Sequence, residues 1–367
     1  MTGRAAVLAE FKKPLEIREF PLVPLSEGEV RVKVEAAGVC GSDVHMWLGR
    51  DPRCPLPMIP GHEGVGRVHE TAGEKKDLLG RVLEPGDLVM WERGIMCGKC
   101  YMCVVKKQPA LCLVRQTYGI SLGCSDPPHF NGNYGEYLHL RAGCHFIRID
   151  GEVDPTVLVQ ASCSGATSAH AVEEARVRPG DAVVIQGAGP VGLFVLAFAQ
   201  RSGATQTFVL DMSRAAGRLE IAKEFGATHT LLVDQTSLEE RLAFVKDHTG
   251  GVGADVVFEC TGHPSAFAEG IKHVAPLGRY VTPGVATPEG EVSLSIFEEL
   301  NRKNARIHGV WVSDTSHLMQ ALRLVRNSGY PFEKTVDHRC SLREATTALE
   351  LMRDRKIMKA VIRPGEN

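Results

Sequence analysis

The sequence predicts an α/β protein in which a β-rich segment precedes a doubly wound parallel sheet. Three observations lead to this prediction. Residues 29–35 alternate apolar and charged side chains, as a half-buried strand does. After residues 154–155, strand-like segments alternate with helix-like ones, which is typical of a parallel sheet with helices on both faces. The glycine-rich stretch 187–192 follows the first of these strands and precedes a helix.

The chain before residue 155 contains short strand-like segments, and many Pro and Gly residues separate them. Residues 84–90 predict a turn followed by a strand, and residues 135–140 predict a further strand. This half of the chain therefore suits a fold of short strands and long loops.

Beyond residue 155 the predicted elements alternate along the chain. We expect strands at 182–185, 207–210, 229–233, 255–259 and 278–282, and helices at 191–201, 218–225, 238–249 and 266–274. The tail from about residue 306 adds one strand, helices near 317–328 and 342–353, and a last strand at 360–362.

Composition narrows the class of protein. The chain has 367 residues, 44% hydrophobic and 23% charged, which fits a globular protein of two domains. A formal net charge of -2 argues against nucleic acid or an anionic membrane as the main partner. Charged residues from Glu10 onward come too early for the apolar core of a signal peptide. Gly and Pro residues interrupt the uncharged stretch 182–200, so we expect a strand, a turn and a helix there rather than a membrane span.

Cysteine usage points to a reducing compartment. The chain has 11 cysteines, an odd number, and neither its length nor its N-terminus suits a secreted disulfide framework. We therefore expect a cytoplasmic protein whose clustered cysteines bind metal. The isolated cysteines are expected to be small buried residues or unreactive thiols.

Residues 187–192 have the spacing of a dinucleotide-binding fingerprint. Gly187 permits a tight turn, Gly189 lets the backbone approach a pyrophosphate, and Gly192 lets helix and strand pack closely. Pro190 and Val191 begin the helix, whose free N–H groups and dipole favour phosphate. We expect a nicotinamide dinucleotide to bind here.

The next predicted strand ends in Asp211, 19 residues beyond Gly192. A carboxylate at this place accepts hydrogen bonds from ribose hydroxyls and repels a 2′-phosphate, which favours NAD over NADP. Arg214 and Arg218 keep NADP open, since either could bind that phosphate. The alternative interpretation is that both arginines lie in solvent at the start of a helix and do not contact the cofactor.

Four cysteines lie within 16 residues: Cys97, Cys100, Cys103 and Cys112. Zinc takes four thiolates tetrahedrally, and a closed shell of sulfur leaves no position for a substrate, so we expect a structural site. Free thiols and a zinc ribbon that binds nucleic acid are the alternatives, and the near-neutral charge disfavours the ribbon.

Two further motifs are ambiguous alone: Cys40 in the stretch 40–45, and His62-Glu63 in the stretch 61–66. Together with the cysteine loop and the glycine fingerprint, in this order, they resemble the zinc-dependent medium-chain alcohol and polyol dehydrogenases of the sorbitol and threonine dehydrogenase type. The resemblance covers essentially the whole chain. It implies a GroES-like catalytic domain, residues 1–155 plus 306–367, into which a Rossmann NAD-binding domain, residues 156–305, is inserted.

The resemblance also implies a catalytic zinc site. Cys40 and His62 would be ligands, and Glu63 would lie close to the metal and enter or leave its shell. The third protein ligand is expected at Cys163, although a shift of one residue in the alignment would place Ser162 there instead.

By the same resemblance, Ser42 would take the proton of the substrate hydroxyl and pass it through the nicotinamide ribose to His45. Histidine ordinarily titrates near neutral pH, which suits proton release. A surface histidine without a catalytic role is the alternative for His45.

Further cofactor contacts follow from the resemblance. Thr167 would lie beside the nicotinamide, and Gly284 and Val285 would present backbone to its carboxamide. Lys359 would meet the pyrophosphate or be a solvated lysine.

Two features depart from the usual pattern of this family. The cysteine loop has eight residues before Cys112, one more than usual, so we expect a bulge near residues 108–109. The link from Asp211 to Arg218 is also longer than usual, which puts a ribose contact by Arg218 in doubt.

The prediction is an NAD-dependent, zinc-dependent dehydrogenase of secondary alcohols, diols or polyols, self-associated as a dimer or tetramer. The substrate pocket is expected near Trp47, Met58, Trp91 and Tyr118. These residues carry no charge that would indicate the class of alcohol. The alternatives are a zinc-free quinone or enone reductase on the same scaffold, and a non-enzymatic zinc-binding module.

Overall fold

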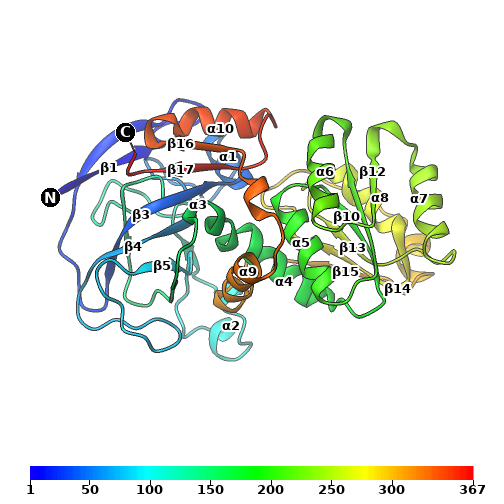
Figure 1. Ribbon diagram of the computed structural model, residues 1–367, viewed down its shortest axis with the longest axis horizontal. Coiled ribbons are helices and arrows are strands. Elements are labelled where there is room, and N and C mark those ends of the chain that lie inside the picture. The colour runs from blue at the N-terminus through cyan, green and yellow to red at the C-terminus, as the bar shows by residue number, and fades with distance from the viewer. Residues whose placement is uncertain (367) are drawn as a thin grey trace. The chain divides into compact units, whose positions relative to one another are not determined.

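The computed structural model describes residues 1–366, which form two compact units. The first unit contains residues 1–163, 314–326 and the described chain from 336 onward. The second contains residues 164–313 and 327–335. Each unit is built on its own β-sheet (Figure 1).

The second unit contains a six-stranded parallel sheet in the order β12-β11-β10-β13-β14-β15. Its strands are β10 (Ala182–Gln186), β11 (Gln206–Asp211), β12 (His229–Leu232), β13 (Ala254–Glu259), β14 (Val274–Thr282) and β15 (Arg306–Gly309). Numbered from β10, this is the order 3-2-1-4-5-6 of a doubly wound dinucleotide-binding fold. The observed sheet confirms the fold class predicted for this part of the chain.

The helix α4 (Ser164–Ala175) precedes β10, and four helices connect the strands from β10 to β14: α5 (Pro190–Arg201), α6 (Ala216–Glu224), α7 (Leu238–Asp247) and α8 (Pro264–His273). Pro190 and Pro264 occupy the first turn of α5 and α8, where a missing N–H costs nothing. Ser237 caps α7 by accepting a hydrogen bond from the Glu240 N–H.

Most predicted elements of this unit are found within a few residues of their expected bounds. The largest difference is β14, which begins at Val274 rather than 278. The extension crosses an irregular pairing with β13, and Leu277 there has φ 64°, a conformation rare for a branched side chain. Alternation along the sequence does not reveal such an irregularity.

The first unit contains a seven-stranded sheet. Its main path is β16-β17-β3-β4-β5-β9, and β8 pairs with β3. The strands are β3 (Val30–Val39), β4 (Glu63–Thr71), β5 (Leu88–Trp91), β8 (Tyr137–Leu140), β9 (Phe146–Arg148), β16 (His338–Ser341) and β17 (Ala360–Arg363). β17 pairs antiparallel with β3, so a strand from the C-terminal part of the chain joins the sheet that the N-terminal strands form.

Shorter elements surround this sheet: the pair β1 (Thr2–Val7) and β2 (Glu16–Pro21), the pair β6 (Gly94–Ile95) and β7 (Gln116–Thr117), and the helices α1 (Gly41–Trp47), α2 (Tyr101–Val104), α3 (Pro155–Leu158), α9 (Thr315–Asn327) and α10 (Ala345–Arg353). A buried apolar core reaches from β1 and β3 to α10. Among the described residues, no helix has both the length and the apolar character needed to cross a membrane.

Candidate metal centres and cofactor site

The first candidate metal centre is the cysteine lobe, residues 97–112. The Sγ atoms of its four cysteines lie within 4.8 Å of one another. The distances between Sγ atoms are 3.5 Å for Cys100 and Cys103, 3.6 Å for Cys97 and Cys112, and 3.9 Å for Cys100 and Cys112. A tetrahedron with zinc–sulfur bonds of about 2.3 Å places its sulfurs about 3.8 Å apart. The four sulfurs therefore fit a zinc ion.

Backbone N–H groups favour the thiolate at two of these sulfurs, those of Cys97 and Cys100, whereas burial raises the pKa of Cys103. The N–H groups of Leu113 and Cys103 donate to the Cys100 sulfur and lower its pKa to about 6, which favours the thiolate that binds zinc. The expected bulge takes the form of a 3-10 turn, Pro109–Leu111, and the Gln108 N–H donates to the Met102 carbonyl at 2.9 Å. The additional residue is thus accommodated without separating Cys112 from its neighbours.

The second candidate metal centre, the dispersed cluster, joins Cys40, His62, Glu63 and Cys163. One ligand atom from each lies within 4.8 Å of the others. Cys40 follows β3 and Glu63 begins β4, and the antiparallel register of these strands places Gly38 opposite Glu63. Cys163 follows a 3-10 turn and lies 3.3 Å from His62 Nε2.

The structure brings Cys163, rather than Ser162, into the dispersed cluster. The Ser162 hydroxyl instead donates to the Val159 carbonyl at 2.7 Å. The hydrogen bond between Cys163 and Cys40 lowers the pKa of Cys163 and raises the pKa of Cys40. Cys163 is therefore the better thiolate of the pair.

Asp43 orients His62. Its Oδ1 lies 3.1 Å from His62 Nδ1, which leaves Nε2 directed to the cluster. Its Oδ2 accepts the Cys40 N–H at 2.7 Å and the Tyr134 hydroxyl at 3.2 Å. The carboxylate thus connects two candidate ligands, and it is buried.

Glu63 forms a buried ion pair with Lys359, whose Nζ lies 2.5 Å from Glu63 Oε2. Burial is the largest single influence on the pKa of Lys359 and lowers it, but the charges of Glu63, Cys40 and Cys163 together with the hydrogen bond to Glu63 raise it. The other carboxylate oxygen, Oε1, is buried and has no hydrogen-bond partner among the described residues. Gly38 makes room for this arrangement, since a Cβ there would lie 2.1 Å from Oε2. An unpartnered oxygen beside two sulfurs and an imidazole fits a metal ion.

The placement of Lys359 differs from the sequence-based expectation. Its ammonium is buried against Glu63 in the first unit, so a contact with a pyrophosphate finds no support in this placement. The alternative of a solvated lysine is wrong, since Lys359 is only 1% exposed.

Ser42 and His45 lie three residues apart on α1, the spacing of neighbours on one helix face. Both are partly exposed, and the Cys40 sulfur is 3.9 Å from the Ser42 hydroxyl. Burial raises the pKa of Asp51, but the hydrogen bonds and charge of Arg53 lower it overall, and His45 is close enough to contribute a smaller effect in the same direction.

The glycine fingerprint lies between β10 and α5. Gly187 has φ +97°, and a Cβ at Gly192 would lie 1.9 Å from the Gly187 carbonyl oxygen. A Cβ at Gly189 would meet nothing within 4 Å, so the backbone there is open to a ligand. Pro190 and Val191 form the first turn of α5. This is the form of a pyrophosphate-binding turn.

Asp211 ends β11, next to the fingerprint. Its Oδ2 accepts the Ala188 N–H at 2.8 Å and its Oδ1 accepts the Met212 N–H at 2.7 Å. The carboxylate thus fixes the turn while remaining partly exposed. Arg218 is the third residue of α6 and is half-buried.

The other expected cofactor residues also belong to the second unit. Thr167 is buried in the first turn of α4. Gly284 follows β14, and its N–H donates to the Glu259 carbonyl at 2.9 Å. Val285 beside it is 41% exposed. Gly284 and the fingerprint lie beyond the carboxyl ends of parallel strands, where such folds bind ligands.

Sequence reasoning missed Asp43, Tyr134 and Arg93. A signal existed for Asp43, which occupies the third position of a helix that begins after Cys40, where a carboxylate caps the backbone. Tyr134 and Arg93 contact the cluster across long distances in the sequence, and no local spacing of residues predicts such contacts.

Comparison with known proteins agrees with this arrangement. A family model described as an alcohol dehydrogenase GroES-like domain matches residues 26–150, and one described as a zinc-binding dehydrogenase matches residues 190–327. The 5-exo-hydroxycamphor dehydrogenase of Pseudomonas putida is 33% identical over 364 residues, 98% of each chain. The L-threonine 3-dehydrogenase of Bacillus subtilis is 30% identical over 95% of this chain and 94% of its own.

Solved structures show the same likeness. An alcohol dehydrogenase from Thermotoga maritima has a TM-score of 0.95 and 44% identity, covering 99% of this chain and 100% of that one. A zinc-binding dehydrogenase from Sinorhizobium meliloti, bound to NADP, has a TM-score of 0.86 and 25% identity, with coverage of 99% and 100%.

Proposed function

The chain belongs to the zinc-dependent medium-chain alcohol and polyol dehydrogenases, and from this premise we propose that it oxidises a secondary alcohol, diol or polyol with NAD. Membership confirms the predicted family, fold class and dehydrogenase activity. It also argues against a zinc-free reductase and against a non-enzymatic zinc module.

The observation that carries the proposal is the dispersed cluster. Two thiols, an imidazole and a buried carboxylate converge from segments up to 123 residues apart. This donor set is that of a catalytic zinc site with protein ligands Cys40, His62 and Cys163. Glu63 has an oxygen available to the metal, while Lys359 balances its charge.

Bound zinc supplies Lewis-acid chemistry that favours loss of a hydroxyl proton near neutral pH, and bound NAD supplies the hydride acceptor. Asp43 keeps the His62 ring oriented through Nδ1. Ser42, beside Cys40, would accept the hydroxyl proton, and His45 on the same helix face would release it to solvent.

In the second unit, the backbone at Gly189 and the start of α5 would bind the pyrophosphate. Asp211 would accept hydrogen bonds from the adenosine ribose and repel a 2′-phosphate, so NAD is the preferred cofactor. Arg214 and Arg218 keep NADP as the second candidate. Thr167, Gly284 and Val285 would contact the nicotinamide end.

The cysteine lobe would hold a second, structural zinc. Its four sulfurs fit a closed tetrahedral shell, which leaves no position for a substrate. None of the 11 cysteines, all within the described residues, forms a disulfide, which suits a reducing compartment and a cytoplasmic location.

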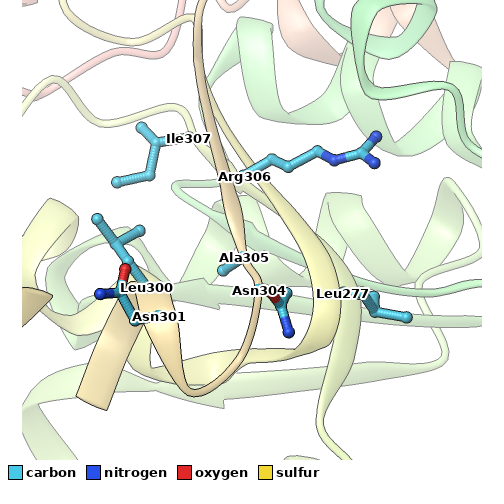
Figure 2. A pocket seen from close by; sticks show the side chains of 7 residues that line it. All are labelled: Leu277, Leu300, Asn301, Asn304, Ala305, Arg306 and Ile307. Atoms are coloured by element: carbon cyan, nitrogen blue, oxygen red, sulfur yellow. The ribbon is translucent and has the colours of Figure 1, made fainter. Parts of the chain in front are cut away.

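We also propose that the chain forms homodimers or homotetramers. β15 is an edge strand whose four residues are exposed. Beside it, Figure 2 shows a surface hollow lined by Leu277, Leu300, Asn301, Asn304, Ala305, Arg306 and Ile307. An exposed edge strand with apolar neighbours is normally covered, and a second copy of the chain would cover this one. Light scattering of the wild type and of Ile307→Lys tests this assembly.

The domain limits expected from the sequence need three changes. We assign residues 156–163 to the catalytic domain, because they belong to the first unit. Residues 306–313, which include β15 paired with β14, and residues 327–335 belong to the second unit, so we assign them to the Rossmann domain.

The main experiment is a screen of NAD and NADP reduction over secondary alcohols, diols and sugar alcohols, combined with zinc analysis. The wild type should contain about two zinc per chain. Cys40→Ser should lose activity and one zinc, while Cys54→Ser, outside both centres, should keep both. Full activity in Cys40→Ser would refute the proposal.

A further inference from the structure

Arg93 places a positive charge beside the dispersed cluster. The residue follows β5 in the first unit and is only 5% exposed. Its guanidinium donates a hydrogen bond to the Cys163 sulfur and interacts with the charge of Cys40. An arginine side chain is not deprotonated in proteins, so the guanidinium keeps its positive charge.

A second buried guanidinium, that of Arg115, lies close to Arg93. Its side chain is 8% exposed, and its Nη1 donates to the Thr117 hydroxyl at 2.8 Å. Its Nε and Nη2 have no hydrogen-bond partner within the described chain. Burial, together with the charge of Arg93, lowers the pKa of Arg115 to about 10. Gly94 gives the guanidinium its space, because a Cβ there would lie 2.3 Å from Nη2.

Glu92 is the carboxylate that faces both guanidinium groups. It is 2% exposed, lies 3.7 Å from Arg115 Nη2, and already accepts the Gly94 N–H at 2.9 Å. Asp314, the next acidic group, is engaged by His317 at 2.9 Å. Buried N–H groups of a charged side chain are costly when they lack acceptors. The unpartnered N–H groups of Arg115, beside Arg93, are therefore suited to receive an additional anion.

We propose that the alcohol oxidised at the dispersed cluster is a 2- or 3-hydroxy acid, and that Arg93 and Arg115 together bind its carboxylate. Arg93 contacts a cysteine of the cluster, so a substrate that reacts there brings its neighbouring atoms within reach of the guanidinium. The planar guanidinium offers two parallel donors to a carboxylate. This inference rests on the proposed function and gives the substrate site a charge that the sequence did not predict.

The reaction leaves the carboxylate unchanged. The C–H bond of the hydroxyl-bearing carbon breaks, and its hydrogen moves with two electrons to the nicotinamide of NAD. The O–H bond also breaks, and its proton leaves to solvent. The hydroxy acid becomes an oxo acid and NAD is reduced.

Matched substrates test the proposal on the wild-type enzyme. We would compare kcat/KM for lactate with that for 1,2-propanediol, and kcat/KM for 3-hydroxybutyrate with that for 1,3-butanediol, using NAD in every assay. At least one acid should exceed its matched diol by about tenfold or more, the gain from a single charge-assisted contact. A wild type that prefers the diol in both pairs, or uses acid and diol equally, overturns the proposal.

Arg93→Gln gives the second readout. It should lower kcat/KM for the preferred acid by about 100-fold, mainly through KM, and change the diol much less. Arg363→Gln, which removes an exposed arginine paired with Glu366, is the control. Equal losses for acid and diol, accompanied by loss of zinc, would show that Arg93 only supports Cys163 and would overturn the proposal. If Arg93→Gln does not fold, the wild-type comparison decides alone.

These outcomes can be told apart from failure of the proposed function. Reduction of NAD with neutral alcohols but not with the acids would refute only the hydroxy-acid assignment. An enzyme that holds zinc and reduces neither NAD nor NADP with any alcohol or hydroxy acid would refute both.

Discussion

The two candidate metal centres offer four donors each but are constructed in opposite ways. The cysteine lobe takes its four sulfurs from 16 consecutive residues, and backbone N–H groups stabilise the thiolates of Cys97 and Cys100. The dispersed cluster takes its donors from segments between residues 40 and 163, and the charged side chains of Asp43, Lys359 and Arg93 support it. The lobe therefore depends on local backbone geometry, whereas the dispersed cluster depends on tertiary structure and buried charge.

The largest effect on activity should come from Cys163→Ser. Loss of this ligand would remove several kcal/mol of charge stabilisation, which corresponds to a fall in kcat/KM of about 1000-fold. Zinc should fall from about two to about one per chain, because the lobe is independent of this residue. Steady-state kinetics and metal analysis measure both. Retention of both metals would restore Ser162 as the alternative ligand.

The next largest effect should be that of Lys359→Met on stability. The substitution leaves Glu63 buried without its counter-charge, and breaking a buried pair in this way costs about 3–5 kcal/mol. Urea unfolding measures the loss. Lys334→Met, which breaks an exposed pair with Glu224, should cost about 1 kcal/mol or less. Adding Glu63→Gln to Lys359→Met should recover much of the stability, and failure to do so would contradict the assigned role of the pair.

Asp43→Asn should have a smaller effect, on metal affinity. An amide would hold the His62 ring less firmly, and loss of such an orienting carboxylate costs about 10–100-fold in metal affinity or activity. Zinc titration of the metal-depleted enzyme measures this change. Asp126→Asn, at an exposed position, is the control. An unchanged affinity would mean that Asp43 only caps α1.

Cys103→Ser should affect activity least. It removes one sulfur of the lobe, so one zinc should be lost and the lobe should become more sensitive to proteolysis. The kcat of the remaining folded enzyme should change by less than about tenfold, or about 1.4 kcal/mol. A loss comparable to that of Cys163→Ser would show that the two centres are not independent.

The same contrast explains what the sequence could predict. The lobe and the fingerprint follow from spacing alone, because their residues are neighbours in the chain. The dispersed cluster required resemblance to a family, since Cys40 and His62 meet only through the register of β3 and β4. Propensity and periodicity contain no information about such pairing.

The buried charges were beyond prediction for a related reason. Lys359 contacts Glu63 across 296 residues, and the expectation that it binds a pyrophosphate or lies in solvent assigned it a different environment. Arg93 and Arg115 approach each other through the pairing of β6 with β7, two strands of two residues that are too short to give a periodic signal. Long-range electrostatic partners become visible only when the fold is known.

The pairing of β17 with β3 has a consequence for biosynthesis. Lys359 and β17 leave the ribosome long after Cys40, His62 and Cys163 have done so. Until then the nascent polypeptide has an incomplete sheet and a Glu63 carboxylate without its counter-ion. The catalytic centre should therefore bind zinc only after synthesis of the chain is nearly complete. Prematurely terminated chains should bind zinc only in the cysteine lobe.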